Sequence, residues 1–323
     1  MTRRLFWQII EKSSHQLPLF YGKILLLLAE FPIDYRAKGV MKKYEEITLK
    51  PLSSAIGAEI GNVDISEELP EKVVGEIRQA LLEYLVVFFR DQDLSDPKRH
   101  RRFTKYFGDL FIHPNFNLGQ SNPEMVYLTR KPGDTAAAGE RWHADTTMMK
   151  NPPMGAILYA LEVPDWGGDT LFANQYMAFE NLSKGMKKFL MKLKAVHNDS
   201  RVAGPGAGLN SRRATKVRED ENWTLTENAH PVVRTHPETK KRSLFVNCIY
   251  VHHFEGMSVE ESQDLLQFLY TESTRPEYSC RFRWKNNSVA FWDNRCVQHL
   301  AIHDNHFSTR RMQRTQIIGD TVI

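Results

Sequence analysis

Two histidines and one aspartate in this chain could share a metal ion only if the fold joins distant parts of the sequence. His143 and Asp145 lie in the segment Trp142-His143-Ala144-Asp145, whereas His299 lies far downstream, after Gln298. Two imidazole nitrogens and a carboxylate oxygen form the ligand set of non-haem iron(II) oxygenases, which leaves coordination positions open for a keto acid and dioxygen. If these residues bind one ion, the middle and the C-terminal part of the chain must meet at one point.

Arg310 follows His299 and adds a cation to this set. A guanidinium can hold a carboxylate by a forked, charge-assisted pair of hydrogen bonds. Arg310 is therefore a candidate for binding the far carboxylate of a keto acid. Taken one by one, the four residues also fit a structural interpretation, as hydrogen-bonded polar side chains.

The His-x-Asp/Glu spacing is a weak signal by itself, because it occurs four times in the chain. The other three pairs are expected to be solvated or hydrogen-bonded polar residues: His197-Asn-Asp199, His236-Pro-Glu238 and His253-Phe-Glu255. His143 differs in its context. It precedes an apolar, strand-like run over 151–164, a turn at 167–170 and another strand at 171–173.

Composition excludes several classes of protein. The 323 residues are 41% hydrophobic, enough for a sizeable core, and the net charge of +4 is mild. The basic clusters at 99–102 and 240–242 are short, so we expect no nucleic-acid partner. The three cysteines lack CxxC spacing, which suits a reducing cytoplasm and argues against a disulfide scaffold or a zinc site. The apolar run at 24–28 is too short to cross a membrane, so we also expect no membrane partner.

The pattern of short strands and inserted helices predicts one barrel domain over 41–323. Helices are predicted at 70–84, 96–107, 176–193 and 260–270; strands are predicted as a pair within 45–65 and at 85–89, 125–128, 232–233, 244–246, 281–284 and 289–292. Such an arrangement suits a jelly-roll barrel, whose mouth can hold a metal among inward-facing side chains. The segment 201–226 is rich in glycine, charge and asparagine and has no clear period, and lids are drawn from such segments.

Residues 1–40 are interpreted as an N-terminal extension. Lys23 interrupts what could have been the core of a signal peptide, and no small-residue cleavage site follows. Two interpretations stay open: a short amphipathic segment that packs on the barrel or on a partner, or a start codon placed too far upstream.

Several segments closely resemble the taurine dioxygenase family, which also contains alkylsulfatases and the dioxygenases of 2,4-dichlorophenoxyacetate. They are WHAD at 142–145, PPMGAILYALEVPDWGGDTLFAN at 152–174, HPVVRTHPETKKRSLFVN at 230–247, FRWKNNSVAFWDNRCVQH at 282–299 and RRMQRTQIIGD at 310–320. The resemblance runs from about Tyr44 to Gly319. It implies a mainly β fold with flanking helices, built on a double-stranded β-helix (jelly-roll, cupin-like) core. It also implies that His143, Asp145 and His299 bind Fe(II), with 2-oxoglutarate and O2 as co-substrates.

The resemblance assigns further residues. Arg310 matches the arginine that binds the distal carboxylate of 2-oxoglutarate, and Thr170 the hydroxyl that shares it. Arg314 matches the anchor of the substrate's acid group. His113, Tyr250 and Thr146 match further substrate-contacting or pocket-lining positions. Because side chains alternate along a strand, Arg310 and Arg314 can share the inner face while Arg311 points away.

The expected reaction is hydroxylation of a small organic anion, with a taurine- or alkanesulfonate-type sulfur compound as the leading substrate. An aryloxyalkanoate or another carboxylate is the alternative, because the segments 247–250 and 254–257 look nearer to the aryloxypropionate branch of the family. Glycine, glutamate and arginine at 139–141 also replace an asparagine-rich segment of the taurine enzymes, which puts taurine itself in doubt. A barrel that binds metal or ligand without turnover, or a metal-dependent hydrolase, is the hypothesis from another class. A homo-oligomer is an open possibility.

Overall fold

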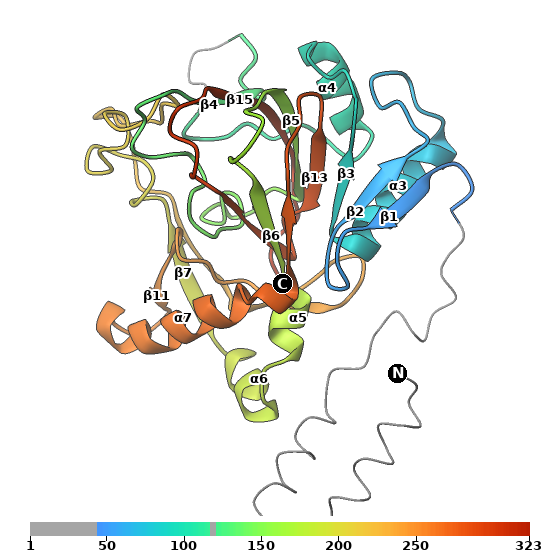
Figure 1. Cartoon of the computed structure of the whole chain (residues 1–323). Coiled ribbons are helices and arrows are strands. Elements are labelled where there is room, and N and C mark those ends of the chain that lie inside the picture. Colours follow the sequence, from blue (N-terminus) through green and yellow to red (C-terminus); the bar gives the residue numbers. More distant parts are fainter. Residues whose placement is uncertain (1–43, 117–120) are drawn as a thin grey trace, which may run out of the picture. The chain divides into compact units, whose positions relative to one another are not determined.

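The computed structural model describes residues 44–116 and 121–323 (Figure 1). Tyr44–Ile323 form one compact unit. The extension expected over residues 1–40 lies outside the described residues, and the single domain over 41–323 stays a prediction. None of the helices in the described ranges combines the length and the hydropathy that a bilayer crossing requires.

A seven-stranded sheet forms the larger wall of the barrel. Its order is β1 (Thr48–Pro51), β2 (Ala58–Gly61), β3 (Val86–Phe89), β13 (Val289–Asp293), β5 (Gly155–Glu162), β15 (Arg310–Ile317) and β4 (Val126–Arg130). The β2–β3 pair is parallel, and the other neighbours are antiparallel. Strands far apart in the sequence therefore lie side by side, so β15 near the C-terminus pairs with β5 and β4.

Strict alternation along the central strands gives each face of this sheet its own core. Ile157 and Tyr159 of β5 join one cluster, whereas Leu158 between them joins the other. The strands β3 and β13 divide their side chains in the same way. Since both faces are covered, these strands read as continuous apolar runs in the sequence.

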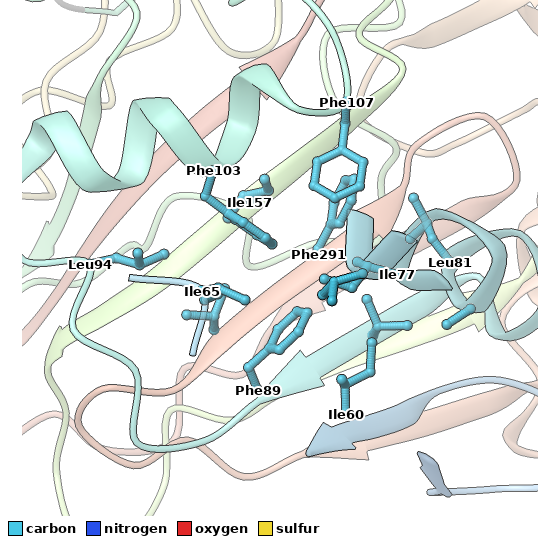
Figure 2. Packing of buried hydrophobic residues seen from close by; sticks show 14 of the residues in the cluster. Ile60, Ile65, Ile77, Leu81, Phe89, Leu94, Phe103, Phe107, Ile157 and Phe291 are labelled. Atoms are coloured by element: carbon cyan, nitrogen blue, oxygen red, sulfur yellow. The ribbon is translucent and has the colours of Figure 1, made fainter. Parts of the chain in front are cut away.

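Two helices cover the outer face of the seven-stranded sheet, which is the face that carries Ile157 and Tyr159. The buried residues Val73, Ile77 and Leu81 of α3 (Glu71–Tyr84) and Phe103 of α4 (Pro97–Lys105) pack against this face. Figure 2 shows Phe89, Phe103, Phe107 and Phe291 gathered between the helices and the sheet.

A second, three-stranded sheet closes the barrel on the inner side. It has the order β12 (Ser279–Phe282), β6 (Thr170–Asn174) and β14 (Val297–Ala301). Phe172 and Phe282 from this sheet share the inner cluster with Leu158, Trp292 and Met312 of the large sheet. The two facing sheets confirm the predicted jelly-roll fold with flanking helices.

The remaining elements build one end of the unit (Figure 1). They are the sheet of β11 (Val251–Phe254), β7 (Lys194–Asn198) and β8 (Glu227–Pro231), the pair β9 (Val233–Thr235) and β10 (Arg242–Leu244), the helices α5 (Gln175–Glu180), α6 (Lys184–Leu190) and α7 (Val259–Ser273), and a 3₁₀ turn at Pro276–Tyr278. Their apolar side chains form a third cluster, in which Phe254, Leu266 and Leu269 are buried.

The prediction of one helix over 176–193 was wrong, because the segment forms α5 and α6 with a break between them. The side chain of Ser183 accepts a hydrogen bond from the backbone of Met186 and starts the second helix. A serine in this position is a strong N-cap and so begins a new helix. The residues that follow form β7, a strand that the sequence analysis missed, as it missed β8.

A histidine buried in α4 should make the stability of the fold depend on pH. His100 is fully buried, its Nδ1 accepts a hydrogen bond from Gln313, and burial lowers its pKa to about 3. In the unfolded chain the imidazole of His100 has a pKa of about 6.5, so below that pH it binds a proton that it does not bind in the folded chain. This contribution to stability is therefore complete above about pH 6.5 and is lost as pH falls towards 3.

We expect the wild-type protein to lose about 2 kcal/mol more unfolding free energy than His100→Gln between pH 7.5 and pH 5. Urea unfolding at several pH values measures this difference in slope, which is independent of any constant destabilisation by the substitution. Parallel curves for the two proteins would contradict the assignment.

Candidate active site

The backbones of His143 and His299 pair with each other in both directions. His143 N donates to His299 O at 3.1 Å, and His299 N donates to His143 O at 2.8 Å. Directly opposite residues of such a pair project their side chains to the same face. The loop that carries His143 is thereby attached to β14, and the two imidazole rings lie 4.1 Å apart.

The three predicted metal ligands converge on one point. Nε2 of His143 lies 3.5 Å from Oδ1 of Asp145, and Nε2 of His299 lies 3.8 Å from the same oxygen. All three side chains are buried, and one ligand atom from each lies within 4.8 Å of the others. Oδ2 of Asp145 finds no hydrogen-bond partner among the described residues.

The Nε2 atoms of both rings face the carboxylate of Asp145. Nδ1 of His143 lies 2.7 Å from the carbonyl of Arg141. Because a carbonyl can only accept, Nδ1 of His143 carries a proton, and Nε2 is the nitrogen that can face an ion. Burial, reinforced by His143, holds the pKa of His299 well below its usual value, which favours its neutral form. An imidazole that offers Nε2, fixed by a carbonyl on its other nitrogen, is a typical metal ligand.

A second cluster meets the same distance criterion but has different chemistry. It consists of His236, Asp293 and Cys296. Nδ1 of His236 accepts hydrogen bonds from the backbone of Glu238 and Thr239, so its Nε2–H donates to Asp293. Arg295 binds both oxygens of Asp293, and burial raises the pKa of the Cys296 thiol well above its usual value. These groups satisfy one another without an ion, so we interpret the cluster as structural.

Asp145 is held as an anion and fixed in place. Burial alone would raise the pKa of its carboxyl, but the charge of Arg314 opposes burial, and that pKa lies well below its usual range. Nη1 of Arg314 lies 3.1 Å from Oδ1. The side chain of Asn294 clamps the backbone: its Oδ1 accepts from Asp145 N at 2.7 Å, and its Nδ2 donates to the carbonyls of Asp145 and Pro153 at 3.0 Å.

Arg310 lies on the same face of β15 as Arg314, and no carboxylate of the described residues forms an ion pair with it. Arg310 and Arg314 are buried, whereas Arg311 is exposed and faces Glu162, as alternation along the strand predicts. Nε and Nη2 of Arg310 lack hydrogen-bond partners in the described part of the chain. The hydroxyl of Thr170 accepts the indole N–H of Trp284 at 2.9 Å, so its own proton is free to be donated to an anion.

One cavity connects these groups. It is lined by eight of the nine predicted site residues: His113, His143, Asp145, Thr170, Tyr250, His299, Arg310 and Arg314. Thr146 is not among the lining residues. Its backbone has a φ of 53°, uncommon for a threonine, at the start of a turn, and its side chain is fully buried. The structure therefore gives no support to the prediction that Thr146 lines the pocket.

The family profile described as "Taurine catabolism dioxygenase TauD, TfdA family" matches residues 48–316 of the chain. The chain belongs to this family. It is 34% identical over 280 residues to an alkylsulfatase of Acinetobacter baylyi, covering 85% of the chain and 86% of that protein. It is 32% identical over 279 residues to an alpha-ketoglutarate-dependent sulfate ester dioxygenase of Pseudomonas putida, covering 86% and 91%.

The fold has a solved counterpart of the same class. The crystal structure of a taurine dioxygenase from Burkholderia xenovorans superposes with a TM-score of 0.71 at 35% identity, covering 86% of this chain and 91% of that one. The family assigned from sequence motifs is therefore confirmed, and the protein is a dioxygenase that depends on 2-oxoglutarate (alpha-ketoglutarate).

Sequence reasoning missed several residues of this dioxygenase's cavity, among them Asn115, Phe116 and Arg213. Arg213 lies in the segment 201–226 that was expected to form a lid, and Val202 and Val217 of that segment also line the cavity. The guanidinium of Arg213 has no carboxylate within ion-pair distance among the described residues, and its Nε donates to the carbonyl of Thr215. The composition of segment 201–226 led to the expectation of a lid, but no feature of the sequence distinguished Arg213 from the other residues of that segment.

Loss of the Asn294 clamp should destabilise the protein strongly. Asn294→Ala leaves the buried N–H and C=O of Asp145 without partners, and each such group costs about 1–3 kcal/mol. We expect urea unfolding to show a loss of about 2–6 kcal/mol. Asn286→Ala, which removes a single exposed bond to Val163, is the control and should lose less than about 1 kcal/mol. Equal losses for the two variants would show that the clamp is not a principal support of the site.

Proposed function

We propose that this protein oxidises a small organic anion, most specifically a sulfate ester or a sulfonate with an apolar chain, using Fe(II), 2-oxoglutarate and O2. One observation carries the proposal. A single cavity holds a buried His-Asp-His cluster, an arginine that forms no ion pair with a described carboxylate, and a second arginine beside the aspartate.

In this proposal His143, Asp145 and His299 bind the iron. Two imidazole nitrogens and one carboxylate suit Fe(II), and no thiolate lines the cavity in the described part of the chain. When bound, the iron supplies the activation of dioxygen, which is chemistry that no side chain provides. The protein's contribution is placement and charge.

Thr170 and Arg310 bind the distal carboxylate of 2-oxoglutarate. Thr170 pairs with Ala301 in the register of β6 and β14, two residues from His299 along the strand. Two residues of strand span about 7 Å, a separation suited to a short dicarboxylate between the metal ligands and Thr170. Arg310 offers two unpartnered N–H groups there, which a carboxylate can accept.

Arg314 and His113 orient the acid group of the substrate. Arg314 uses Nη1 for Asp145, and its Nε remains without a partner. Nδ1 of His113 accepts from the backbone of Asn115, so its Nε2–H is a free donor. Burial, with Arg314 adding to it, lowers the pKa of His113 to about 3, so this donor is a neutral ring throughout the physiological pH range.

The rest of the cavity favours an apolar chain. Phe116, Val202, Val217, Ile249 and Tyr250 line it, and Asp145 is the one carboxylate among the described lining residues. An ammonium group on the substrate would therefore lack a counter-ion. This composition, with the sulfate ester relatives, favours alkyl sulfates and alkanesulfonates over aminosulfonates such as taurine.

The overall reaction balances without a further reagent. One oxygen atom enters the C–H bond next to the sulfur group, and the other enters the succinate formed when 2-oxoglutarate loses CO2. The hydroxylated carbon then eliminates sulfate from an ester, or sulfite from a sulfonate, and becomes a carbonyl. We further propose that the enzyme works in the cytoplasm, which its three free cysteines suit.

The direct test is release of succinate from 2-oxoglutarate with Fe(II) and ascorbate, across a panel of anions. We expect alkyl sulfates and alkanesulfonates to stimulate succinate release at least about tenfold over taurine, a ratio of about 1.4 kcal/mol in transition-state stabilisation. Sulfate or sulfite should appear in equal amount with succinate. If only 2,4-dichlorophenoxyacetate stimulates succinate release, the substrate class is an aryloxyalkanoate. If none of the anions supports coupled turnover, a protein that binds its ligand without turnover is favoured.

Arg314→Ala should weaken binding of the organic anion and spare the slow decay of 2-oxoglutarate without substrate. Charge-assisted hydrogen bonds are worth about 1.5–3 kcal/mol, so KM for the anion should rise about 10- to 100-fold. Arg311→Ala, which removes the exposed neighbouring arginine, is the matched control and should leave KM unchanged. Equal loss of both reactions in Arg314→Ala would contradict the separation of roles.

A further inference from the structure

A second buried arginine lies directly beside the arginine assigned to 2-oxoglutarate. Arg130 ends β4, and its register partner on β15 is Arg310. Opposite residues of an antiparallel pair share a face and lie about 5 Å apart at Cβ. Both side chains also contact Gly168: a Cβ added there would meet Arg310 Cδ at 3.2 Å and Arg130 Nη2 at 3.4 Å. The two guanidinium groups are therefore close neighbours.

Neither guanidinium forms an ion pair with a carboxylate of the described residues. Arg130 is 6% exposed and Arg310 9%, and Nε and Nη2 of each are buried without a hydrogen-bond partner in the described residues. The guanidinium of Arg310 also lies 5.8 Å from the centre of the Trp284 ring.

The carboxylates of this region bind other groups. Asp169 pairs with Arg281, Asp304 accepts from Gly168 N, and Asp134 accepts from the backbone of Lys131 and Ala214. Two like charges directly opposite each other are destabilising, and a buried guanidinium without a partner adds to the cost. Burial, and then Arg130, lowers the pKa of Arg310 to about 10, which agrees with mutual repulsion. An anion bound beside the two arginines would relieve this repulsion.

Two cavities border this pair. Arg310 lines the main cavity, and both Arg130 and Arg310 line a small second cavity. The two cavities share Leu128, Ala138, Ala301 and Arg310. A ligand that extends from the metal cluster past Thr170 therefore brings its far end towards Arg130.

We propose that Arg130 is a second binding residue for the distal carboxylate of the keto acid, which it holds together with Arg310. This inference rests on the proposed placement of 2-oxoglutarate. A carboxylate has enough lone pairs to accept from two guanidinium groups. The arrangement selects dicarboxylic keto acids over monocarboxylic ones, because a neutral tail would leave both cations buried and unpaired.

The test uses N-oxalylglycine, a stable mimic of 2-oxoglutarate, titrated into the Mn(II)-loaded protein by calorimetry. Arg130→Met should bind it about 10- to 100-fold more weakly than wild type, whereas Arg130→Lys, which keeps the charge without the fork, should be intermediate. Lys131→Met, which removes an exposed positive charge next in sequence, is the matched control and should bind as wild type does.

A second readout separates binding from mere structural support. Without ligand, Arg130→Met should melt at a higher temperature than wild type, because the repulsion with Arg310 is gone, while its stabilisation by N-oxalylglycine should shrink. A variant that melts lower and binds the mimic like wild type would overturn the inference and leave the keto-acid site intact. Failure of the wild-type protein itself to bind N-oxalylglycine would instead refute the proposed placement of 2-oxoglutarate.

Discussion

The reciprocal backbone pair between His143 and His299 is the constraint on which the site depends. Two short hydrogen bonds attach the loop after Trp142 to β14, and this pairing determines that both imidazoles project from one surface. Asp145 then needs only to be held two residues further on, which the Asn294 clamp does from the turn after β13. The metal cluster is thus built by backbone pairing, and its side chains follow from it.

Arginines outnumber carboxylates around the His-Asp-His cluster, so the cavity carries an excess of positive charge. Three buried arginines, Arg130, Arg310 and Arg314, share the inner face of β4 and β15, and Asp145 neutralises only one of them. The cavity is therefore an anion site before any ligand arrives. In the proposed function, the keto acid and the organic anion bind the folded chain and not the unfolded one, so each would stabilise the fold by mass action. The positions of the two guanidinium groups along β15 would then direct the two anions to different places.

Much of this arrangement follows from the sequence, because it depends on strong local patterns. The apolar runs of β3, β5 and β13, the helix faces of α3 and α4, and the alternation that separates Arg311 from its neighbours were all predictable. Features that depend on tertiary pairing were not. Ser183 reads as an ordinary polar residue in a helix, yet it caps a new one, and Asn294 gains its role only when β13 lies beside the metal loop. Arg130 is unremarkable until the register places it opposite Arg310.

The segment 201–226 also lines the cavity, but side-chain hydrogen bonds hold it in place and it does not pair as a strand with the barrel. Asp199, at its start, accepts hydrogen bonds from Asn115, from the indole of Trp223 and from the backbone of Thr226, so one buried carboxylate ties both ends of the segment to the rim. Trp223 also packs on Gly204, where a Cβ would come within 2.6 Å of its ring. The segment is fixed at these points, and Val202, Arg213 and Val217 between them line the cavity. In the proposed function, water that this segment keeps out of the cavity would strengthen the charge-assisted contacts of Arg310 and Arg314 with their anions.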